Sequence, residues 1–203
     1  PFADLKLRMA GPTLGRIIRA ELGDAFVSAN LPMLHKRTVD AIGQSEFRPG
    51  IERDSERVDL SGEFERQYFG DVMLFAMVRL TEQGYPASQP DAEAIAAVVE
   101  ATEAEMRGRY SAKHGQIVAR IDRLDALFSD PARWWQRDAR LAEACHAWRR
   151  FIANMRDNFA EDSRAWQLIE ASANRVARKA AIGAAIGRYR ADRAAWRAAL
   201  EQA

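Results

Sequence analysis

The sequence has one cysteine, Cys145, among its 203 residues, so no disulfide can form within the chain. A disulfide-rich secreted scaffold therefore finds no support, and a reducing compartment is expected. The chain also has no run of about 18 apolar residues, so we expect no transmembrane helix. Its first residues lack the basic and then apolar pattern of a signal peptide. Together these absences predict a soluble cytoplasmic protein.

Lysine is nearly absent, with 4 Lys against 26 Arg, and alanine is abundant, as is typical of a bacterial, GC-rich genome. The charge is uneven along the chain. Residues 131–203 hold 14 Arg and Lys and 8 Asp and Glu, a balance of +6, whereas residues 1–130 hold 16 and 21, a balance of −5. Such asymmetry can mark a nucleic-acid surface, but the compositional bias lowers the weight of arginine as evidence for phosphate contacts.

Strand patterns are scarce, and apolar residues recur mostly at helical spacing. Residues 68–80 are nearly all apolar, which is typical of a central, buried helix. We therefore predict an all-α fold, an irregular bundle of about six to eight helices. One domain spanning residues 1–203 is expected, with a subdivision near residues 129–131 into an acidic half (1–129) and a basic half (130–203) as the alternative.

Glycine, proline and capping residues set the predicted helix boundaries. Ser88 is expected to cap a helix with Pro90 in its first turn. Residues 131–159 are expected to form one helix. Helix breaks are expected at Gly11-Pro12, at Gly84 to Pro86, at Gly108 and Gly115, at Ser129 to Pro131, and near residues 172–174 or 183–187.

Residues 43–62 form a long polar loop without sustained periodicity. Pro49 and Gly50 fit the central positions of a type II turn, so a small β-hairpin pairing residues 45–47 with residues 51–53 is the expected strand content. An irregular segment of this length within a compact domain is usually functional or disordered.

Asp71 is the polar residue that stands out in the apolar helix, where it shares a stripe with Phe64, Tyr68 and Phe75. A buried carboxylate without a partner costs several kcal/mol, so Asp71 needs a cation, a hydrogen-bond donor or a ligand. Arg66 and Arg79 are candidate partners in a structural ion pair.

The functional alternative is a site that joins Asp71, Arg66 and Tyr68 to polar residues of the 44–62 loop. These three are the candidate catalytic residues, and the sequence leaves open whether the protein is an enzyme.

Glu143 and His146 have the Glu-x-x-His spacing that di-iron bundle proteins use in pairs. A second pair is missing, because neither His35 nor His114 has an acidic residue three positions earlier. His114 precedes Gly115 at an expected bend and is predicted to lie on the surface. There is also no Gly-rich phosphate loop. We therefore predict no metal and no cofactor, with Glu143 and His146 as the weak metal candidates.

Five tryptophans recur at helical spacing among other apolar residues, which is more typical of core or interface positions than of base or sugar stacking. They are Trp134, Trp135, Trp148, Trp166 and Trp196.

The C-terminal helix has seven basic residues and one acidic residue between positions 171 and 200. Its bulky and small apolar residues fall on roughly opposite faces, so we expect it to pack within the chain or between two copies. Its basic edge should face Glu93, Glu100 and Glu103.

The leading functional prediction is a helical protein-interaction or assembly module without its own catalysis, which binds a protein partner or a second copy. One alternative is an enzyme, or a helical domain of one, with a polar site in the 44–71 region. A second is nucleic-acid or acidic-surface binding through the C-terminal helix.

Overall fold

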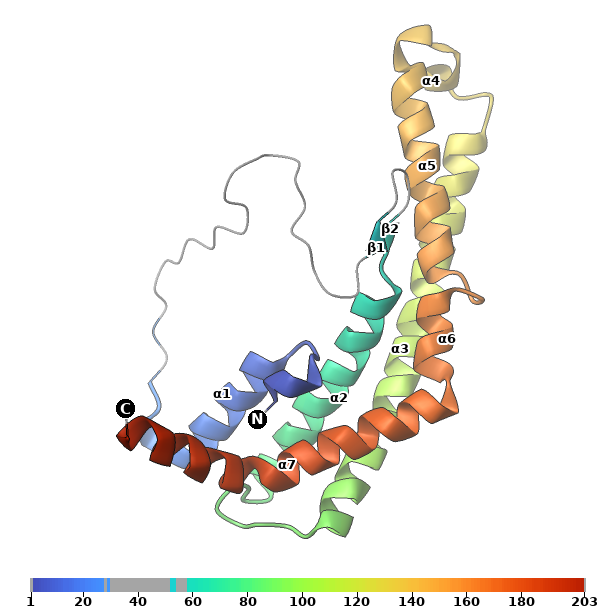
Figure 1. The fold of residues 1–203 in the computed structure, drawn as a ribbon. Helices are drawn as coiled ribbons and strands as arrows, with labels where there is room; N and C mark the ends of the chain where they lie inside the picture. The colour runs from blue at the N-terminus through green and yellow to red at the C-terminus, as the bar shows by residue number, and fades with distance from the viewer. Residues whose placement is uncertain (1, 28, 30–51, 54–57, 203) are drawn as a thin grey trace.

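The computed structural model describes residues 2–27, 29, 52–53 and 58–202 of the chain, and within these ranges the fold is all-α, as predicted (Figure 1). None of the helices in these ranges is both long and apolar enough to span a membrane. The helices are η1 (Ala3–Leu5), α1 (Ala10–Leu22), η2 (Gly23–Ala25), α2 (Ser61–Glu82), α3 (Ala92–Ser129), α4 (Trp134–Arg137), η3 (Ala139–Leu141), α5 (Ala142–Phe159), α6 (Arg164–Glu170) and α7 (Ser172–Glu201).

Helix α2 is the centre of the core, as its apolar sequence predicts. It contacts α1, α3, α6 and α7, and its buried residues cover a little more than half of its circumference. From Tyr68 onward this buried face is wholly apolar, whereas Gln67, Asp71 and Phe75 on the other side are at least partly exposed. The fully buried members are Tyr68, Phe69, Val72, Met73, Ala76 and Met77.

The N-terminal segment crosses α2 at Gly70. The amide of Arg8 donates to the Arg66 carbonyl oxygen at 3.2 Å. A Cβ atom at Gly70 would lie 2.4 Å from the carbonyl oxygen of Arg8, closer than any side chain can sit. Glycine at this position therefore allows the backbone approach that closes one side of the core.

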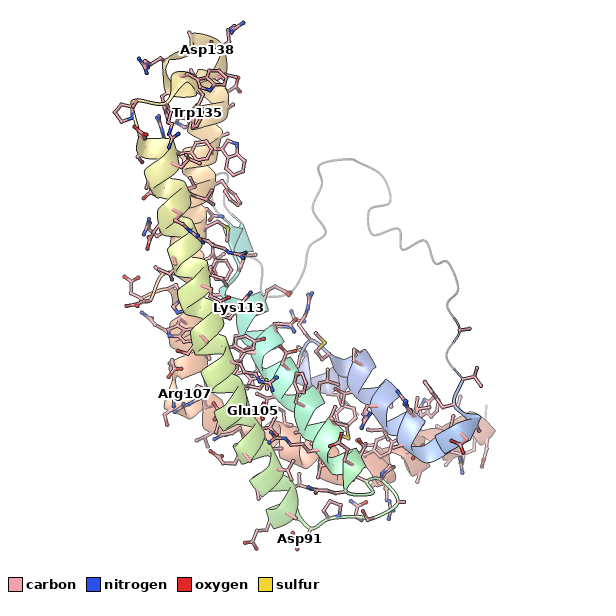
Figure 2. The ribbon with its side chains drawn as sticks, turned by 180° about the vertical axis from the view of Figure 1, so that it is seen from behind. Asp91, Glu105, Arg107, Lys113, Trp135 and Asp138 are labelled. Carbon is pink, nitrogen blue, oxygen red and sulfur yellow. The ribbon has the colours of Figure 1, made fainter. Side chains whose placement is uncertain are left out.

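Two units are visible in the arrangement of the helices. The body consists of α1, α2, α6, α7 and residues 92–114 of α3. The arm, residues 117–156, is an antiparallel hairpin of the rest of α3 and most of α5, closed by α4 and η3, and it projects away from the body (Figure 1). Figure 2 shows Trp135 and Asp138 at the far end of the arm, and Asp91 at the opposite end of α3.

Several predicted helix boundaries are wrong. Helix α3 continues through Gly108 and Gly115 instead of breaking there. Both glycines are exposed, so each costs only about 1 kcal/mol of helix propensity, which the packing of the flanking turns offsets. The expected helix over residues 131–159 is divided, because Asp138 has an extended backbone and caps the following turn by accepting from the amide of Arg140.

The other boundaries differ by smaller shifts. Helix α1 begins at Ala10 and includes Pro12 in its first turn, where a missing N–H leaves no hydrogen bond unmade. Helix α3 is capped by Asp91 rather than Ser88, through a 2.8 Å bond from the Ala94 amide. The last segment breaks at Ala171, beside the first of the two predicted places.

The strand content is one antiparallel ladder of β1 (Glu52–Arg53) with β2 (Val58–Asp59). It falls within residues 44–60, where strand was predicted, but the paired residues differ. Residues 45–47, the predicted partner strand, lie outside the described residues, and the partner of residues 52–53 follows them in sequence. Beyond β2, the Leu60 amide donates to the Asn158 side-chain oxygen at 2.7 Å, which ties this segment to the base of α5.

Candidate functional site

Asp71 has two hydrogen-bond partners in the body. The Tyr110 hydroxyl of α3 donates to one carboxylate oxygen at 2.6 Å, and the Gln67 amide donates to the other at 2.8 Å. Burial raises the pKa of Tyr110, and its hydrogen bond to the Asp71 carboxylate raises it further. Asp71 therefore finds donors, as a carboxylate in an apolar helix must, but neither donor is one of the arginines considered from the sequence.

The other two candidate catalytic residues have different partners. Arg66 pairs with Glu63 at 3.2 Å and donates to the carbonyl oxygen of Lys6. The Tyr68 hydroxyl donates to a Glu103 carboxylate oxygen at 2.8 Å. Arg79 pairs with Glu105. The structure thus brings Asp71, Arg66 and Tyr68 to three separate contacts, and most of the 44–62 loop lies outside the described residues.

The weak metal candidates, Glu143 and His146, are both exposed on α5. Within the described residues, no group of three or more His, Cys, Asp or Glu side chains is placed to hold a metal ion. Cys145 between them is buried, as expected for a core position.

His114 is not on the surface, and this prediction was wrong. It is 6% exposed, and its ring stacks on Trp166 of α6 with a centroid distance of 4.2 Å and an angle of 8°. Its Nε2 atom lies 2.7 Å from the Phe159 carbonyl oxygen. Because α3 does not bend at Gly115, His114 faces the junction of α5 and α6.

A polar hollow of about 730 Å³ opens between α3, α6 and α7. Sequence reasoning did not assemble it, because its walls come from three helices far apart in the chain. Its charged lining residues are Glu100, Glu103, Arg107, Glu170, Arg175 and Lys179, and Trp166 forms an apolar wall.

The deepest charge in this hollow is Glu103, which is 4% exposed. It accepts a hydrogen bond from the neutral Tyr68 hydroxyl. Its nearest charged neighbours are Lys179 at 3.8 Å and Arg175 at 4.0 Å, both beyond hydrogen-bond distance. Burial raises the pKa of Tyr68, and the hydrogen bond to Glu103 and the charge of that carboxylate raise it further, so Tyr68 stays a donor.

The arm has an edge, here called the apolar edge, where Trp148 and Phe151 of α5 meet Phe128 of α3. Helical spacing places Leu124 and Leu127 on the same side of α3 as Phe128. Trp148 is 46% exposed and Phe151 48% exposed. Trp148 stacks on Phe128 with ring centroids 5.3 Å apart and meets Phe151 edge-on at 5.4 Å. At the tip of the arm, Trp134 is 66% exposed beside Trp135.

The opposite edge of the arm is polar. Arg156 of α5 donates to Asp122 at 2.9 Å and to Asp125 at 2.8 Å on α3. With about 100° between successive residues, Phe151 lies about 140° around α5 from Arg156. The two helices are therefore held by ion pairs along one edge while large apolar side chains remain in contact with water along the other.

The basic residues of α7 are mostly paired. Arg178 makes a two-bond pair with Glu65, at 2.7 and 3.0 Å, and Lys179 pairs with Glu100 at 2.6 Å. Arg190 donates to the Pro86 and Ala87 carbonyl oxygens, and Arg193 pairs with Glu21. Of the predicted basic edge, Lys179 thus faces Glu100 and Glu103, whereas Arg190 and Arg193 contact other partners, and no contact of α7 with Glu93 is found among the described residues.

The expected packing of α7 holds for part of its length. Ile182, Ile186 and Tyr189 are buried, whereas Trp196 and Leu200, further along the same face, are 68% and 57% exposed. The end of the helix therefore extends past the core.

Comparison of the chain with protein-family models, with curated proteins and with solved structures finds no match.

Proposed function

We propose that this chain is a helical protein-interaction module whose arm docks on a partner protein through its apolar edge. The observation that carries the proposal is the half-exposed pair Trp148 and Phe151 on a projecting hairpin. Aromatic side chains dominate binding energy at protein interfaces, where their large apolar area leaves water. Among the described residues, this two-helix hairpin has no third helix of its own to cover such an edge.

Charge beside the apolar edge favours an acidic partner. Arg120 and Arg123 precede Leu127 by seven and four positions, which places them on the same stripe of α3. Neither has a hydrogen bond or an ion pair with any of the described residues, whereas Arg156 on the opposite edge has two acidic partners. An amphipathic segment with acidic residues beside its apolar face would pair with both arginines and cover both aromatic rings.

The proposal can be tested by site-specific photo-crosslinking of the full chain in its source cells. A crosslinking residue at position 151 should capture one defined protein, and the same residue at position 146, exposed elsewhere on α5, is the matched control. The captured protein is then purified, and its affinity is measured for the unmodified chain and for the double variant Arg120→Glu, Arg123→Glu.

The affinity should fall at least about tenfold in the double variant, as for the loss of charge-assisted contacts, with the thermal midpoint unchanged. The exposed Arg188→Glu should bind as the unmodified chain does. Equal capture at positions 146 and 151, or no capture at 151, would contradict the proposal. Capture of a second copy of this chain would show assembly through the arm and contradict docking on a different protein.

The two alternatives have less support. An enzyme using Asp71, Arg66 and Tyr68 would need their polar atoms to converge, but each has different partners. A phosphate-binding α7 would need unpaired arginines along one face. Of its seven basic residues, Arg178, Lys179, Arg190 and Arg193 already contact acids or carbonyl oxygens.

A further inference from the structure

The polar hollow in the body is separate from the apolar edge of the arm. Four of its charged side chains are already paired: Arg107 with Glu170 across the α3–α6 junction, and Lys179 with Glu100 across the α3–α7 junction. Within each pair the two charges neutralise each other. Glu103 and Arg175 are therefore the remaining opposite charges in the hollow.

Arg175 has unused hydrogen-bond donors. Its side chain is 21% exposed, and its one contact with a charged group of the described residues is Glu103 at 4.0 Å. Among the described residues, no acceptor lies within hydrogen-bond distance of its guanidinium, and it has no other partner. The guanidinium is partly open to the hollow, and its planar fork matches the two oxygens of a carboxylate. Its donors are therefore available to a carboxylate in the hollow.

Glu103 determines which anions can enter. Its carboxylate has a side-chain exposure of 5%, accepts one hydrogen bond from Tyr68, and lies too far from both cations for a further one. A multiply charged anion such as phosphate would meet the charge of Glu103, which neither Lys179 nor Arg175 approaches to hydrogen-bond distance. Two negative charges in contact repel each other, particularly where burial weakens the screening by water and salt. A ligand that carries its own cation next to its carboxylate avoids this repulsion.

We propose that this hollow binds a free α-amino acid, with its carboxylate on the guanidinium of Arg175 and its ammonium group on the carboxylate of Glu103. The adjacent opposite charges of the ligand match the adjacent opposite charges of the protein. Tyr68 holds Glu103 in place from the core side and acts as a positioning residue.

The remaining wall leaves room for an apolar ligand side chain. Trp166, Ala104 and Gly108 line the hollow, and no atom lies within 4 Å of the position that a Cβ on Gly108 would occupy. Gly115, on the same helix and equally open, is not part of the lining. Substitution of the two glycines therefore gives a matched pair: a larger side chain fills the hollow at position 108 and reaches only solvent at position 115.

The test is calorimetric titration of the full chain with L-leucine and L-phenylalanine, and with isocaproate, isoamylamine and inorganic phosphate as partial probes. Saturable binding of at least one amino acid is expected, with each partial probe at least about tenfold weaker, as for the loss of one charged hydrogen-bonding group. Gly108→Leu should abolish binding, whereas Gly115→Leu should retain it. Arg175→Gln should weaken binding at least about tenfold.

Glu103→Gln keeps an amide oxygen that can accept from Tyr68 and removes the negative charge, so it separates recognition of the ammonium group from folding. In this variant L-leucine and isocaproate should bind with similar affinity. The proposal is overturned if neither amino acid binds, if isocaproate or phosphate binds the unmodified chain as tightly as L-leucine, or if Gly115→Leu loses binding as Gly108→Leu does. Docking of a protein on the arm is tested separately, because its crosslinking readout does not involve the hollow.

Discussion

The body and the arm use apolar residues in different ways. In the body, the apolar cluster around α2 is continuous, and buried carboxylates such as Glu65 and Glu103 are met by donors from neighbouring helices. In the arm, Ile121, Cys145 and Ile152 are buried between two helices but do not join that cluster, and Trp148 and Phe151 remain half exposed. The body therefore buries its apolar residues in one cluster, whereas the arm leaves part of its apolar area exposed to water.

The largest expected effect is in the body. Arg178→Ala leaves the buried Glu65 carboxylate, whose side chain is 6% exposed, with Asn174 as its remaining partner. Breaking a buried pair from one side should lower the free energy of unfolding by about 3 kcal/mol. Urea unfolding followed by circular dichroism measures this change. Arg140→Ala, which removes an arginine whose side chain is 88% exposed from an ion pair in the arm, is the control and should not change the midpoint. Equal effects of both substitutions would contradict the comparison.

A pair of glycine substitutions should change stability in opposite directions. Gly70→Ala places a methyl group against the Arg8 carbonyl oxygen and should destabilise the protein by about 1 to 3 kcal/mol. Gly115→Ala meets open space on α3 and should stabilise it by up to about 1 kcal/mol through helix propensity. Thermal unfolding of both variants gives the comparison. A stabilising Gly70→Ala would mean that the N-terminal segment does not close on α2.

Alkaline pH should act on the body through its tyrosines. Burial raises the pKa of all four, Tyr68, Tyr85, Tyr110 and Tyr189, above 10.0. Because the pKa of each tyrosine is higher in the folded than in the unfolded state, its protonated form stabilises the native state. This contribution to the free energy of unfolding is fully present below pH 10 and is lost as the pH rises above 10. Each tyrosine should lower the free energy of unfolding by about 1.4 kcal/mol per pH unit until the pH reaches its folded-state pKa.

Absorbance of tyrosinate, recorded together with helical circular dichroism, checks this prediction. The two signals should change in one transition well above pH 10. Tyrosinate that forms near pH 10 while the helical signal is intact would show that these hydroxyls are open to water.

A smaller effect is expected for the Asp71–Tyr110 contact. Asp71→Ala and Tyr110→Phe should each destabilise the protein, and the double-mutant cycle should give a coupling of about 1 kcal/mol for their hydrogen bond. Unfolding free energies of the two single variants and the double variant provide the measurement. Additive effects would mean that Asp71 is solvated and that Tyr110 packs without it.

The smallest effect is expected at the apolar edge. Phe151→Ser removes a half-exposed ring, so the free energy of unfolding should change by less than about 0.5 kcal/mol. The same variant should lose binding to a protein captured at position 151. A large loss of stability would make Phe151 a core residue and would weaken the contrast between arm and body.

Much of the fold could be predicted because it follows from local patterns. The apolar run over residues 68–80 predicted the central helix, and the scarcity of strand patterns limited strand to residues 44–60. Helix continuity was harder to predict. Glycine at positions 108 and 115 suggested a break, but contacts made by His114 and its neighbours hold α3 together across both. Local propensity is worth about 1 kcal/mol at each glycine, and tertiary packing outweighs it.

The candidate site could be predicted only in part. The sequence showed that Asp71 needs a partner, because a lone carboxylate stands out in an apolar helix. It did not show that the partner is Tyr110, which is 39 residues away on α3. For the polar hollow, the sequence predicted only that the basic edge of the C-terminal helix faces Glu100 and Glu103, since the other lining residues have ordinary spacing on three separate helices.

By itself, the sequence determined the helical class, the identity of the buried helix and the need of Asp71 for a donor. These depend on periodicity and on the cost of burying charge, which any arrangement of the chain must obey. Tertiary structure decided which side chains meet. The antiparallel pairing of α3 with α5 left Trp148 and Phe151 on an uncovered edge, and the crossing of α6 and α7 over α3 placed Arg175 beside Glu103. Those contacts depend on how helices cross, and helical spacing along one segment does not encode the crossing.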